Sequence, residues 1–361
     1  MKKYRIRFCT PFLFGLFLTC TGAIAADSSF TPGLINFSRD EYRGASQNWS
    51  VCQDSTGFIF VANSNGLLEY DGFHWTLYPS HGGNIIRAVA CGPQGRIYSS
   101  GYRELGYWSR NGYGKLDYTS LNSLADSLFN QNVEFWKIVI LGNKVLFQSF
   151  TQLLIYENGK ITSVNFRDFV NSVYHIDNQL FVNVLNQGIY KLSGNKLEPF
   201  ITGDIFKEVI VRFILPYGEN TYLLGTDSHG ILISEKGKVT EWNTPLNDSF
   251  KKNRINRGCY TKTGDLVVGT ILDGIYLVNS KGELVWNLNA GKGLQNNTVL
   301  GIHPDASGNL WLALDQGIDL VLTSGYEGVQ MVRAEKIGAV YTAAVFADSL
   351  YLGTNQGVFA G

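Results

Sequence analysis

A short stretch with the pattern of a β-hairpin recurs along this chain and constrains its fold more than any other feature. The clearest copy is residues 265–278, Asp-Leu-Val-Val-Gly-Thr-Ile-Leu-Asp-Gly-Ile-Tyr-Leu-Val. One apolar run ends at Gly269-Thr270 and the next begins at Gly274, so the residues between them can supply the positive φ of a tight turn. Related stretches are 58–70, 180–192, 222–233, 310–321 and 350–359, with weaker ones at 97–108 and 145–156.

The glycine that opens the second half of the hairpin returns at a regular interval. Gly188, Gly230, Gly274, Gly317 and Gly357 are 42, 44, 43 and 40 residues apart. Repeats of about 40 to 45 residues build helical solenoids or β-propellers, and these units are rich in Val, Ile, Tyr, Phe and Gly rather than in helical patterns. The sequence therefore predicts an all-β propeller of seven four-stranded blades. Because eight repeats are visible, a ring of eight blades is the alternative.

The repeats also predict where each blade lies. In blade one we expect strands at 49–53, 58–62, 66–70 and 73–78, with the two-residue turn Asp71-Gly72 before the last. The later blades are expected at 85–116, 135–164, 170–200, 209–242, 255–286 and from 299 to about 332. Residues 121–129 are expected to form a helical turn or two outside the ring. The propeller domain then spans 26–335, and residues 336–361 begin a further repeat that the chain truncates.

An apolar segment, Leu34-Ile35-Asn36-Phe37, precedes the first complete repeat inside a stretch from 30 to 42 that reads as extended. A single leading strand can close a ring of repeats by pairing with the last blade, whereas an open ring would expose two sheet edges. We expect this strand to pair with the last blade and close the ring.

Residues 1–25 have the pattern of a secretory signal peptide. They contain four basic residues, an apolar core at 12–18, and Ala23-Ile24-Ala25 as a small-x-small cleavage signal. The apolar core is well short of the roughly 20 residues of a membrane span. Leu16-Phe17-Leu18-Thr19-Cys20 loosely resembles a lipobox, so a lipoprotein is the alternative, although Thr19 is larger than the residues usual before the cysteine.

The charge and the cysteines narrow the classes of partner and site. The chain has 30 basic and 30 acidic residues, so nothing in the net charge points to nucleic acid or an anionic membrane. Beyond the first 25 residues three cysteines remain, Cys52, Cys91 and Cys259, each late in the first strand of its repeat. Because they belong to different blades, we expect them to be free, small, buried residues outside bridging distance of one another.

Motifs for metal binding, cofactor binding or catalysis do not stand out. The five histidines are scattered, and the sequence has no His-x-x-x-His, Cys-x-x-Cys, Gly-x-Ser-x-Gly or phosphate-loop pattern. We therefore expect no metal, no cofactor and no catalytic residues. A propeller enzyme acting on glycans, as a lyase or a glycosidase, remains an alternative, although no catalytic carboxylate pair can be chosen from one sequence.

Aromatic and cationic residues divide into two groups by their place in the repeat. Those at equivalent hairpin positions are expected to pack between blades: Phe60, Tyr98, Tyr276, Trp311 and Tyr351. A second group lies near the start of the innermost strands, where a propeller brings residues of all blades around one channel mouth: Trp49, Arg87, Trp136, Arg212 and Arg257. These five are the candidate ligand-binding residues. The alternative is that the arginines pair with acidic neighbours around a narrow channel.

The repeats resemble the two-component-regulator propeller repeats of Bacteroidetes sensor proteins. The resemblance rests on 308–318, Gly-Asn-Leu-Trp-Leu-Ala-Leu-Asp-Gln-Gly-Ile, and on 349–358, Ser-Leu-Tyr-Leu-Gly-Thr-Asn-Gln-Gly-Val. The segments at 48–54, 66–72 and 104–108 are similar to those of sensors in which a triple-tyrosine domain follows the propellers. The likeness covers nearly all of the chain after residue 25.

This resemblance implies a non-catalytic, periplasmic, ligand-sensing propeller of a transcriptional or two-component sensor. The ligand is then expected to be a small molecule or an oligosaccharide derived from a polysaccharide or related nutrient. It also implies a second propeller and a triple-tyrosine domain as partners in the same full-length protein, with a homodimer possible. A propeller scaffold for envelope assembly is a further alternative.

Overall fold

The structure, a computed structural model, describes residues 32–130, 132–323, 338–346 and 349–360. These residues belong to two compact units, one within Phe30–Val329 and the other within Gln330–Gly361. The expected signal peptide and Cys20 lie outside the described residues. Among the described residues, no helix has the length and apolar character that a membrane span requires.

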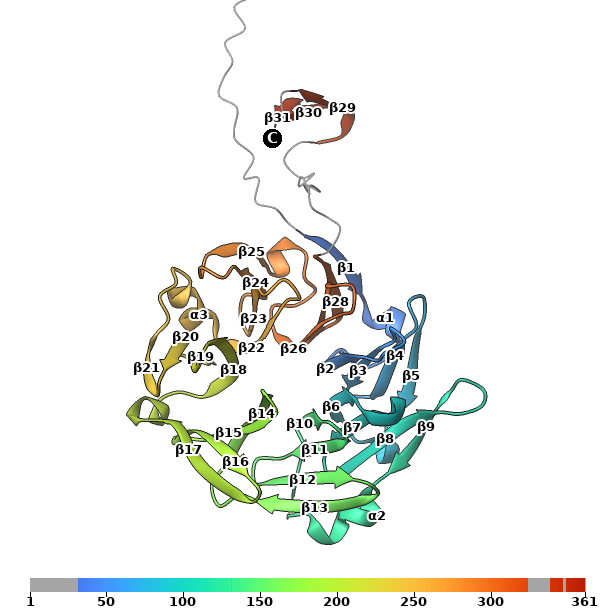
Figure 1. Ribbon diagram of the computed structural model, residues 1–361. Helices are drawn as coiled ribbons and strands as arrows, with labels where there is room; N and C mark the ends of the chain where they lie inside the picture. The colour runs from blue at the N-terminus through green and yellow to red at the C-terminus, as the bar shows by residue number, and fades with distance from the viewer. Residues whose placement is uncertain (1–31, 131, 324–337, 347–348, 361) are drawn as a thin grey trace, which may run out of the picture. The chain divides into compact units, whose positions relative to one another are not determined.

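The larger unit is built from seven four-stranded antiparallel sheets around a ring (Figure 1). Six of them take four consecutive strands each and are called blades one to six. Blade one has β2 (Asn48–Gln53), β3 (Ile59–Asn63), β4 (Gly66–Tyr70) and β5 (Trp75–Pro79); blade two β6 (Ile86–Cys91), β7 (Ile97–Gly101), β8 (Glu104–Arg110) and β9 (Leu116–Ser120); blade three β10 (Lys137–Leu141), β11 (Lys144–Gln148), β12 (Gln152–Glu157) and β13 (Lys160–Asn165).

The other sheets continue the same pattern. Blade four has β14 (Val170–Ile176), β15 (Gln179–Val184), β16 (Gly188–Ser193) and β17 (Lys196–Thr202); blade five β18 (Val211–Gly218), β19 (Thr221–Thr226), β20 (Ile231–Glu235) and β21 (Lys238–Glu241); blade six β22 (Ile255–Tyr260), β23 (Leu266–Thr270), β24 (Ile275–Val278) and β25 (Leu284–Leu288). The seventh sheet, blade seven, combines β26 (Val299–Pro304), β27 (Leu310–Leu314) and β28 (Ile318–Leu322) with β1 (Gly33–Phe37).

The first strand of each blade lies innermost and contacts the first strands of the two neighbouring blades. These contacts form a closed cycle, β2-β6-β10-β14-β18-β22-β26 and back to β2. A closed ring of radially arranged four-stranded sheets is a β-propeller. The predicted all-β propeller class is therefore confirmed.

The repeated glycine has a positive φ in every copy and, in some blades, a close neighbouring backbone. Gly274 has φ +66°, in the left-handed region that favours glycine. A Cβ at this position would also collide with the backbone carbonyl of Leu288, which lies on the neighbouring strand β25. Gly188 shares both features, with the backbone carbonyl of Ile201 as its neighbour, whereas at Gly230 and Gly317 a Cβ would meet the side chains of Asn247 and Gln295. A positive φ is the feature common to all of the repeated glycines.

The Asp-x-x-Gly turns between the first and second strands are held by the aspartate side chain. In blade seven, Asp305 Oδ1 accepts hydrogen bonds from the backbone N–H groups of Ser307 and Asn309, at 2.8 and 2.9 Å. Asp54 makes the equivalent bonds in blade one. Such turns fix the register of the hairpin that follows.

Blades pack on one another through apolar side chains from both faces of each sheet. Phe60, Tyr98, Tyr276 and Trp311 are buried in these interfaces, as expected. Tyr351 is different, because it is 36% exposed on the sheet of the smaller unit. That unit is a three-stranded antiparallel sheet of β29 (Val340–Phe346), β30 (Ser349–Thr354) and β31 (Gly357–Ala360).

The ring is closed by pairing between its two chain ends. Strand β1 runs antiparallel to β28, with Leu34 opposite Val321 and Phe37 opposite Ile318. The pairing expected for the leading strand is therefore present in the structure. Phe37 stacks on Trp311 of the adjacent strand β27, with ring centroids 5.5 Å apart.

A buried carboxylate reinforces this closure. Asp319 Oδ1 accepts hydrogen bonds from Asn36 Nδ2 of β1 and from Gln295 Nε2, both at 2.7 Å. Burial raises the pKa of Asp319, and the hydrogen bonds from Asn36 and Gln295 act in the opposite direction. Gln295 Nε2 also donates to the backbone carbonyl of Phe37 at 3.0 Å, so one side chain joins both strands of the closure.

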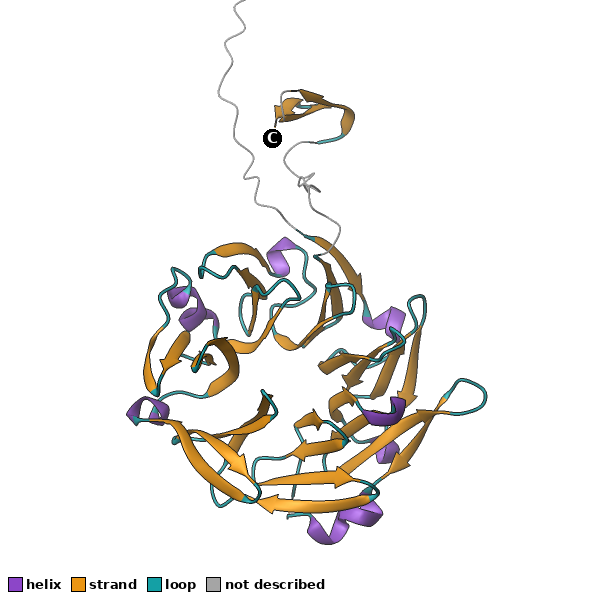
Figure 2. Cartoon of the chain, viewed as in Figure 1, coloured by secondary structure: helices purple, strands orange, loops and turns teal. Residues whose placement is uncertain are grey.

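The α-helices are short and connect strands (Figure 2). Helix α2 (Asn122–Ala125) and the 3₁₀ turn Asp126–Leu128 confirm the helical turns expected at 121–129. Two others were not predicted, α1 (Arg39–Tyr42) and α3 (Asn247–Asn253). The extended reading of 38–42 is wrong because Ser38 and Glu41 form a capping box that starts α1.

The prediction for the cysteines is also wrong in two respects, because Cys91 and Cys259 are only partly buried and two of the three sulfurs lie close together. All three are free, but Cys52 Sγ and Cys91 Sγ lie 2.8 Å apart. Counted from the first-turn glycines Gly57 and Gly95, Cys91 lies one place later in its repeat than Cys52, and the innermost strands of the two blades pack directly on each other. Membership of different blades therefore does not separate them.

Removing β1 should destabilise the larger unit. Deleting residues 27–36 leaves the edge of β28 unpaired and releases Phe37 from its aromatic neighbours, so we expect a loss of about 3 kcal/mol or more, the cost typical of removing one buried Phe. Denaturant unfolding measures the change. Deleting only 27–31 keeps β1 and is the control; equal midpoints for the two deletions would contradict closure by this strand.

Candidate functional site at the ring axis

Most innermost strands carry a β-bulge at their second residue. The extra residue of each bulge, which has no partner on the second strand, is Trp49, Arg87, Asn171, Arg212, Asn256 or Leu300. A bulge leaves its extra residue unpaired and re-aims its side chain. In blade three, Trp136 immediately precedes β10, and its backbone N–H donates to the backbone carbonyl of Gln148. Four of the five predicted site residues thus share one position at the start of a blade.

Trp49, Arg87 and Trp136 form a stacked group inside the ring. The Arg87 guanidinium carbon lies 4.1 Å from the ring centroid of Trp49 and 4.6 Å from that of Trp136. The two indoles are 6.1 Å apart, although they come from blades one and three, which are not neighbours. Their side chains therefore reach each other across the interior of the ring. Cation–π contacts of this kind hold an arginine and an aromatic ring in fixed orientation.

The charge of Arg87 is neutralised within this group. Its Nε donates to Glu134 Oε1 at 2.6 Å, and the Arg87 side chain is only 15% exposed. The alternative in which the arginines pair with acidic neighbours is therefore correct for Arg87. A partly buried, paired arginine between two indoles serves to position those indoles.

Arg212 and Arg257 belong to a second group, together with two residues that sequence reasoning missed. Lys137 Nζ donates to Ser172 Oγ at 2.9 Å and lies 4.1 Å above the ring of Tyr174. The charge of Arg257 acts on Lys137, and the charge of Arg212 acts on Arg257. Lys137 follows Trp136 directly in the chain, so blade three contributes to both groups.

The second group carries an excess of positive charge. Burial, and then the charge of Arg257, lower the pKa of Lys137 to about 7. Desolvation by the surrounding blades, and then the charge of Arg212, lower the pKa of Arg257 to about 10, although the residue keeps an exposed surface. Among the described residues, none of Lys137, Arg212 and Arg257 forms a salt bridge with a carboxylate. The Nε of Arg212 is buried and has no hydrogen-bond partner in the described part of the chain.

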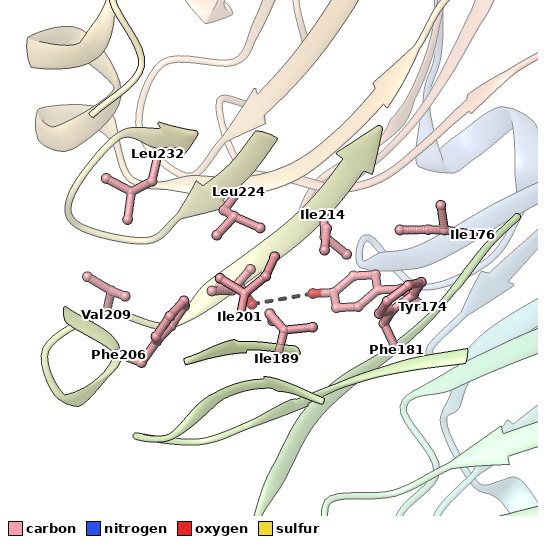
Figure 3. Close-up of a cluster of buried hydrophobic side chains, with 11 residues drawn as sticks. Tyr174, Ile176, Phe181, Ile189, Ile201, Phe206, Val209, Ile214, Leu224 and Leu232 are labelled. Atoms are coloured by element: carbon pink, nitrogen blue, oxygen red, sulfur yellow. Dashed lines mark hydrogen bonds between the residues drawn. The ribbon is translucent and has the colours of Figure 1, made fainter. Parts of the chain in front are cut away.

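Tyr174 anchors this group to the hydrophobic core between blades four and five. Its ring lies in a cluster with Ile189 and Ile214, and its hydroxyl donates to the carbonyl of Val211 at 3.4 Å (Figure 3). Burial raises the pKa of Tyr174 to about 12, so the phenol stays neutral. The aromatic face beneath Lys137 is therefore a fixed surface.

The bulge asparagines have a structural role. Asn171 Nδ2 donates to the carbonyl of Val211, the first residue of the next innermost strand, at 2.8 Å. Asn256 Nδ2 donates in the same way to Val299 at 2.7 Å. These bonds join blade four to blade five and blade six to blade seven. Asparagine at the bulge thus links adjacent blades by a hydrogen bond. Arginine or tryptophan at the bulge instead belongs to the Trp49–Arg87–Trp136 group or to the group of Lys137, Arg212 and Arg257.

The site consists of aromatic and cationic side chains with one paired carboxylate. No cluster of three or more His, Cys, Asp or Glu side chains that could hold a metal ion occurs among the residues the structure covers. Glu134 is paired with Arg87. The arrangement of aromatic faces beside cations suits binding of an anionic ligand with an apolar or sugar face.

No family model and no curated protein matches this sequence. Solved structures do match. An extracellular domain from B. thetaiotaomicron, described as part of a hybrid two-component system, has a TM-score of 0.64 at 20% identity over 91% of this chain and 45% of that domain. Virginiamycin B lyase from Staphylococcus aureus has a TM-score of 0.61 at 14% identity over 80% and 98% of the two chains. The WD40 propeller of Doa1 has a TM-score of 0.61 at 10% identity over 78% and 94%.

These likenesses bear on the fold. The chain spans less than half the length of the two-component extracellular domain that it matches. At identities of 20% or less, the two-component domain, the lyase and the WD40 propeller show a shared architecture. A propeller fold is thus established, and function has to be argued from the site.

The depressed pKa of Lys137 predicts how its replacement alters stability. The unfolded lysine has a pKa near 10.4, so the folded state binds fewer protons between pH 7 and 10 and its stability rises with pH over that range. Below pH 7 the folded state bears the full cost of the enclosed charge. Lys137→Met should therefore raise the melting temperature by a few degrees at pH 6, with the gain shrinking toward pH 10.

Differential scanning calorimetry in chloride buffers measures this dependence. The exposed pair Lys207 and Asp204 offers the control, because Lys207→Met removes a charge that is not enclosed. A gain for Lys137→Met that is constant with pH would contradict the depressed pKa.

Proposed function

We propose that this chain is a non-catalytic, ligand-sensing propeller of a periplasmic sensor that acts upstream of transcriptional control. The repeat signature and the likeness to an extracellular domain of a hybrid two-component system support this proposal. The signal-peptide pattern of residues 1–25 supports export. The proposed stimulus is an oligosaccharide or small molecule derived from a polysaccharide or a related nutrient.

The proposed domain is a ring of seven blades within residues 26–335. The closed cycle of innermost strands and the pairing of β1 with β28 favour seven over eight. Residues 336–361 are then the beginning of a further repeat. We propose a second propeller and a triple-tyrosine domain as its partners in the full-length protein, and a homodimer as the state in which such a sensor would act.

The proposed ligand contacts are Trp49, Arg87, Trp136, Arg212 and Arg257. The observation that carries this site is the meeting of side chains from non-neighbouring blades inside the ring, with indoles in one group and unpaired cations in the other. Indoles stack on the apolar face of a sugar, and arginine forks bind carboxylate or sulfate with two hydrogen bonds. The ligand class we propose is an acidic carbohydrate, or an acidic loop of a partner chain.

Two other roles stay open as outcomes of the test. The likeness to virginiamycin B lyase, at 14% identity, concerns fold alone. A propeller enzyme acting on glycans would cleave the oligosaccharide that it binds. An envelope scaffold would bind another protein and no sugar.

Isothermal titration with matched oligosaccharides tests the proposal. Uronate-containing or sulfated oligosaccharides should bind, and neutral ones of the same length should bind at least tenfold more weakly. Combining Trp136→Ala with Arg212→Ala should weaken binding by well over tenfold, because a lost charge-assisted hydrogen bond alone costs about 1.5 to 3 kcal/mol. Chromatography of the titrated sample reports any cleavage.

Arg96→Ala is the matched control, since Arg96 also lies over an aromatic ring, that of Tyr107, but outside the site. Equal binding of neutral and acidic oligosaccharides would overturn the proposed ligand class. An acidic ligand that binds the double variant as tightly as the parent protein would place the site elsewhere.

A further inference from the structure

We propose that Lys137, Arg212 and Arg257 form a subsite for one oxyanion, a sulfate or carboxylate group, inside the ring. This inference deepens the proposed ligand site and rests on it for its biological role, although the subsite can be tested without any sugar. The three cations come from blades three, five and six, so the ring alone brings them together.

The charges of this subsite call for a counter-ion. Like charges placed close together in a poorly solvated space repel strongly. Arg257 lies close enough to both Lys137 and Arg212 to interact electrostatically with each. Glu134, which could compensate them, is paired with Arg87. A bound anion would supply the negative charge that the described side chains leave out.

Donors at the subsite are free for an external acceptor. Arg212 Nε is buried without a partner, which costs free energy unless a ligand accepts its hydrogen bond. Arg257 uses Nη1 for the carbonyl and side-chain oxygens of Asn256, and the structure records no hydrogen bond from its Nη2. Lys137 has three donor hydrogens and one recorded acceptor, Ser172. Arg257 is an exposed residue although other blades surround its charge, so space remains beside it.

The groups around the subsite define its response to pH. Tyr174 and Ser172 face Lys137 from β14, Arg257 approaches from β22 and Arg212 from β18, and the neutralised pair of Arg87 and Glu134 lies on the side of blade two. Of these groups, Lys137 is the one expected to change charge near neutral pH. An anion should therefore bind best below pH 7 and lose affinity as pH rises above it.

Titration with inorganic sulfate against chloride at constant ionic strength tests the subsite, because sulfate keeps its charge across this range. We expect saturable stabilisation at pH 6 in thermal unfolding and at least tenfold weaker binding at pH 9. Arg212→Met should weaken sulfate binding at least tenfold at either pH. Lys137→Met should weaken binding at pH 6 and remove most of its pH dependence.

Arg96→Met is again the control and should leave sulfate binding unchanged. Sulfate stabilisation that is equal in the parent protein and in Arg212→Met would overturn the subsite. Sulfate binding together with a failure of acidic oligosaccharides would keep the subsite and reject the proposed sensing function. Binding of acidic oligosaccharides without sulfate binding would reject the subsite alone.

A separate observation supports a second inference, that Cys52 and Cys91 form a disulfide between blades one and two in an oxidising compartment. Their sulfur atoms lie 2.8 Å apart on strands β2 and β6. Two residues before each cysteine, Ser50 Oγ accepts a hydrogen bond from the N–H of Val89 at 2.9 Å, which fixes the two strands in this register. Little backbone movement is therefore needed to join the sulfurs.

The bond would form by exchange with the disulfide of a thiol–disulfide oxidoreductase. Cys91 is the more accessible thiol; as a thiolate it attacks one oxidoreductase sulfur, forms a mixed disulfide and releases the other sulfur as a thiolate. Cys52 then loses its proton and attacks Cys91 Sγ, which displaces the oxidoreductase. The two cysteines give up two electrons and two protons, and the oxidoreductase disulfide becomes a dithiol.

Alkylation of the exported protein after denaturation tests the bond by mass spectrometry. Without reductant we expect only Cys259 to be alkylated, and with reductant all three cysteines beyond the signal-peptide region. Reduction should also lower the unfolding midpoint of the parent protein and leave that of Cys52→Ser unchanged, with Cys259→Ser as the control that keeps the response. Alkylation of Cys52 and Cys91 without reductant in exported protein would overturn this inference.

Discussion

Convergence of the innermost strands on one axis is the constraint on which the rest of the molecule depends. Seven strands start close to each other, and side chains there meet partners from blades that are far apart in the sequence. Space at this point is limited, so the residue types must differ from blade to blade. Asparagine joins neighbouring blades at two positions, tryptophan or arginine occupies the position in blades one, two and five, and Leu300 occupies it in blade seven. The same position thus serves both ring stability and the candidate site.

The bulge at the start of the strand makes this possible. A regular strand would place its second residue against the next blade, where an arginine would be costly to bury. The extra residue of a bulge is outside the pairing register, so its side chain can take another direction. Arg87 and Arg212 share this position but differ in environment, because Glu134 compensates one and no carboxylate described here compensates the other. The bulge therefore sets the position of the arginine, and the residues of the neighbouring blade determine whether its charge is neutralised.

Much of the fold was readable from the sequence because each blade is a local unit. The glycine interval and the Asp-x-x-Gly turns predict strands that the structure places within a few residues. Position near the start of an innermost strand selected the five candidates Trp49, Arg87, Trp136, Arg212 and Arg257. Glu134, Lys137 and Tyr174 were missed because their importance arises from contacts across the ring, which no local pattern encodes. The Cys52–Cys91 contact was missed because the two cysteines lie one place apart in their repeats, and the same offset, which also brings Ser50 to Val89, is a property of how the innermost strands pack.

The composite last blade has a consequence for how such a chain matures. Asn36 and Asp319 are hydrogen-bonded across 283 residues of sequence, so β1 leaves the ribosome or the export channel long before its partner exists. Contacts of such high sequence separation form late, and an edge strand that waits is open to wrong partners. If a completed chain has not yet paired its own β1, the free edge of its β28 is open to β1 of a second molecule. That exchange is the geometry of a domain-swapped dimer. The order of chain delivery, as well as the final contact energy, therefore bears on whether each ring closes on itself.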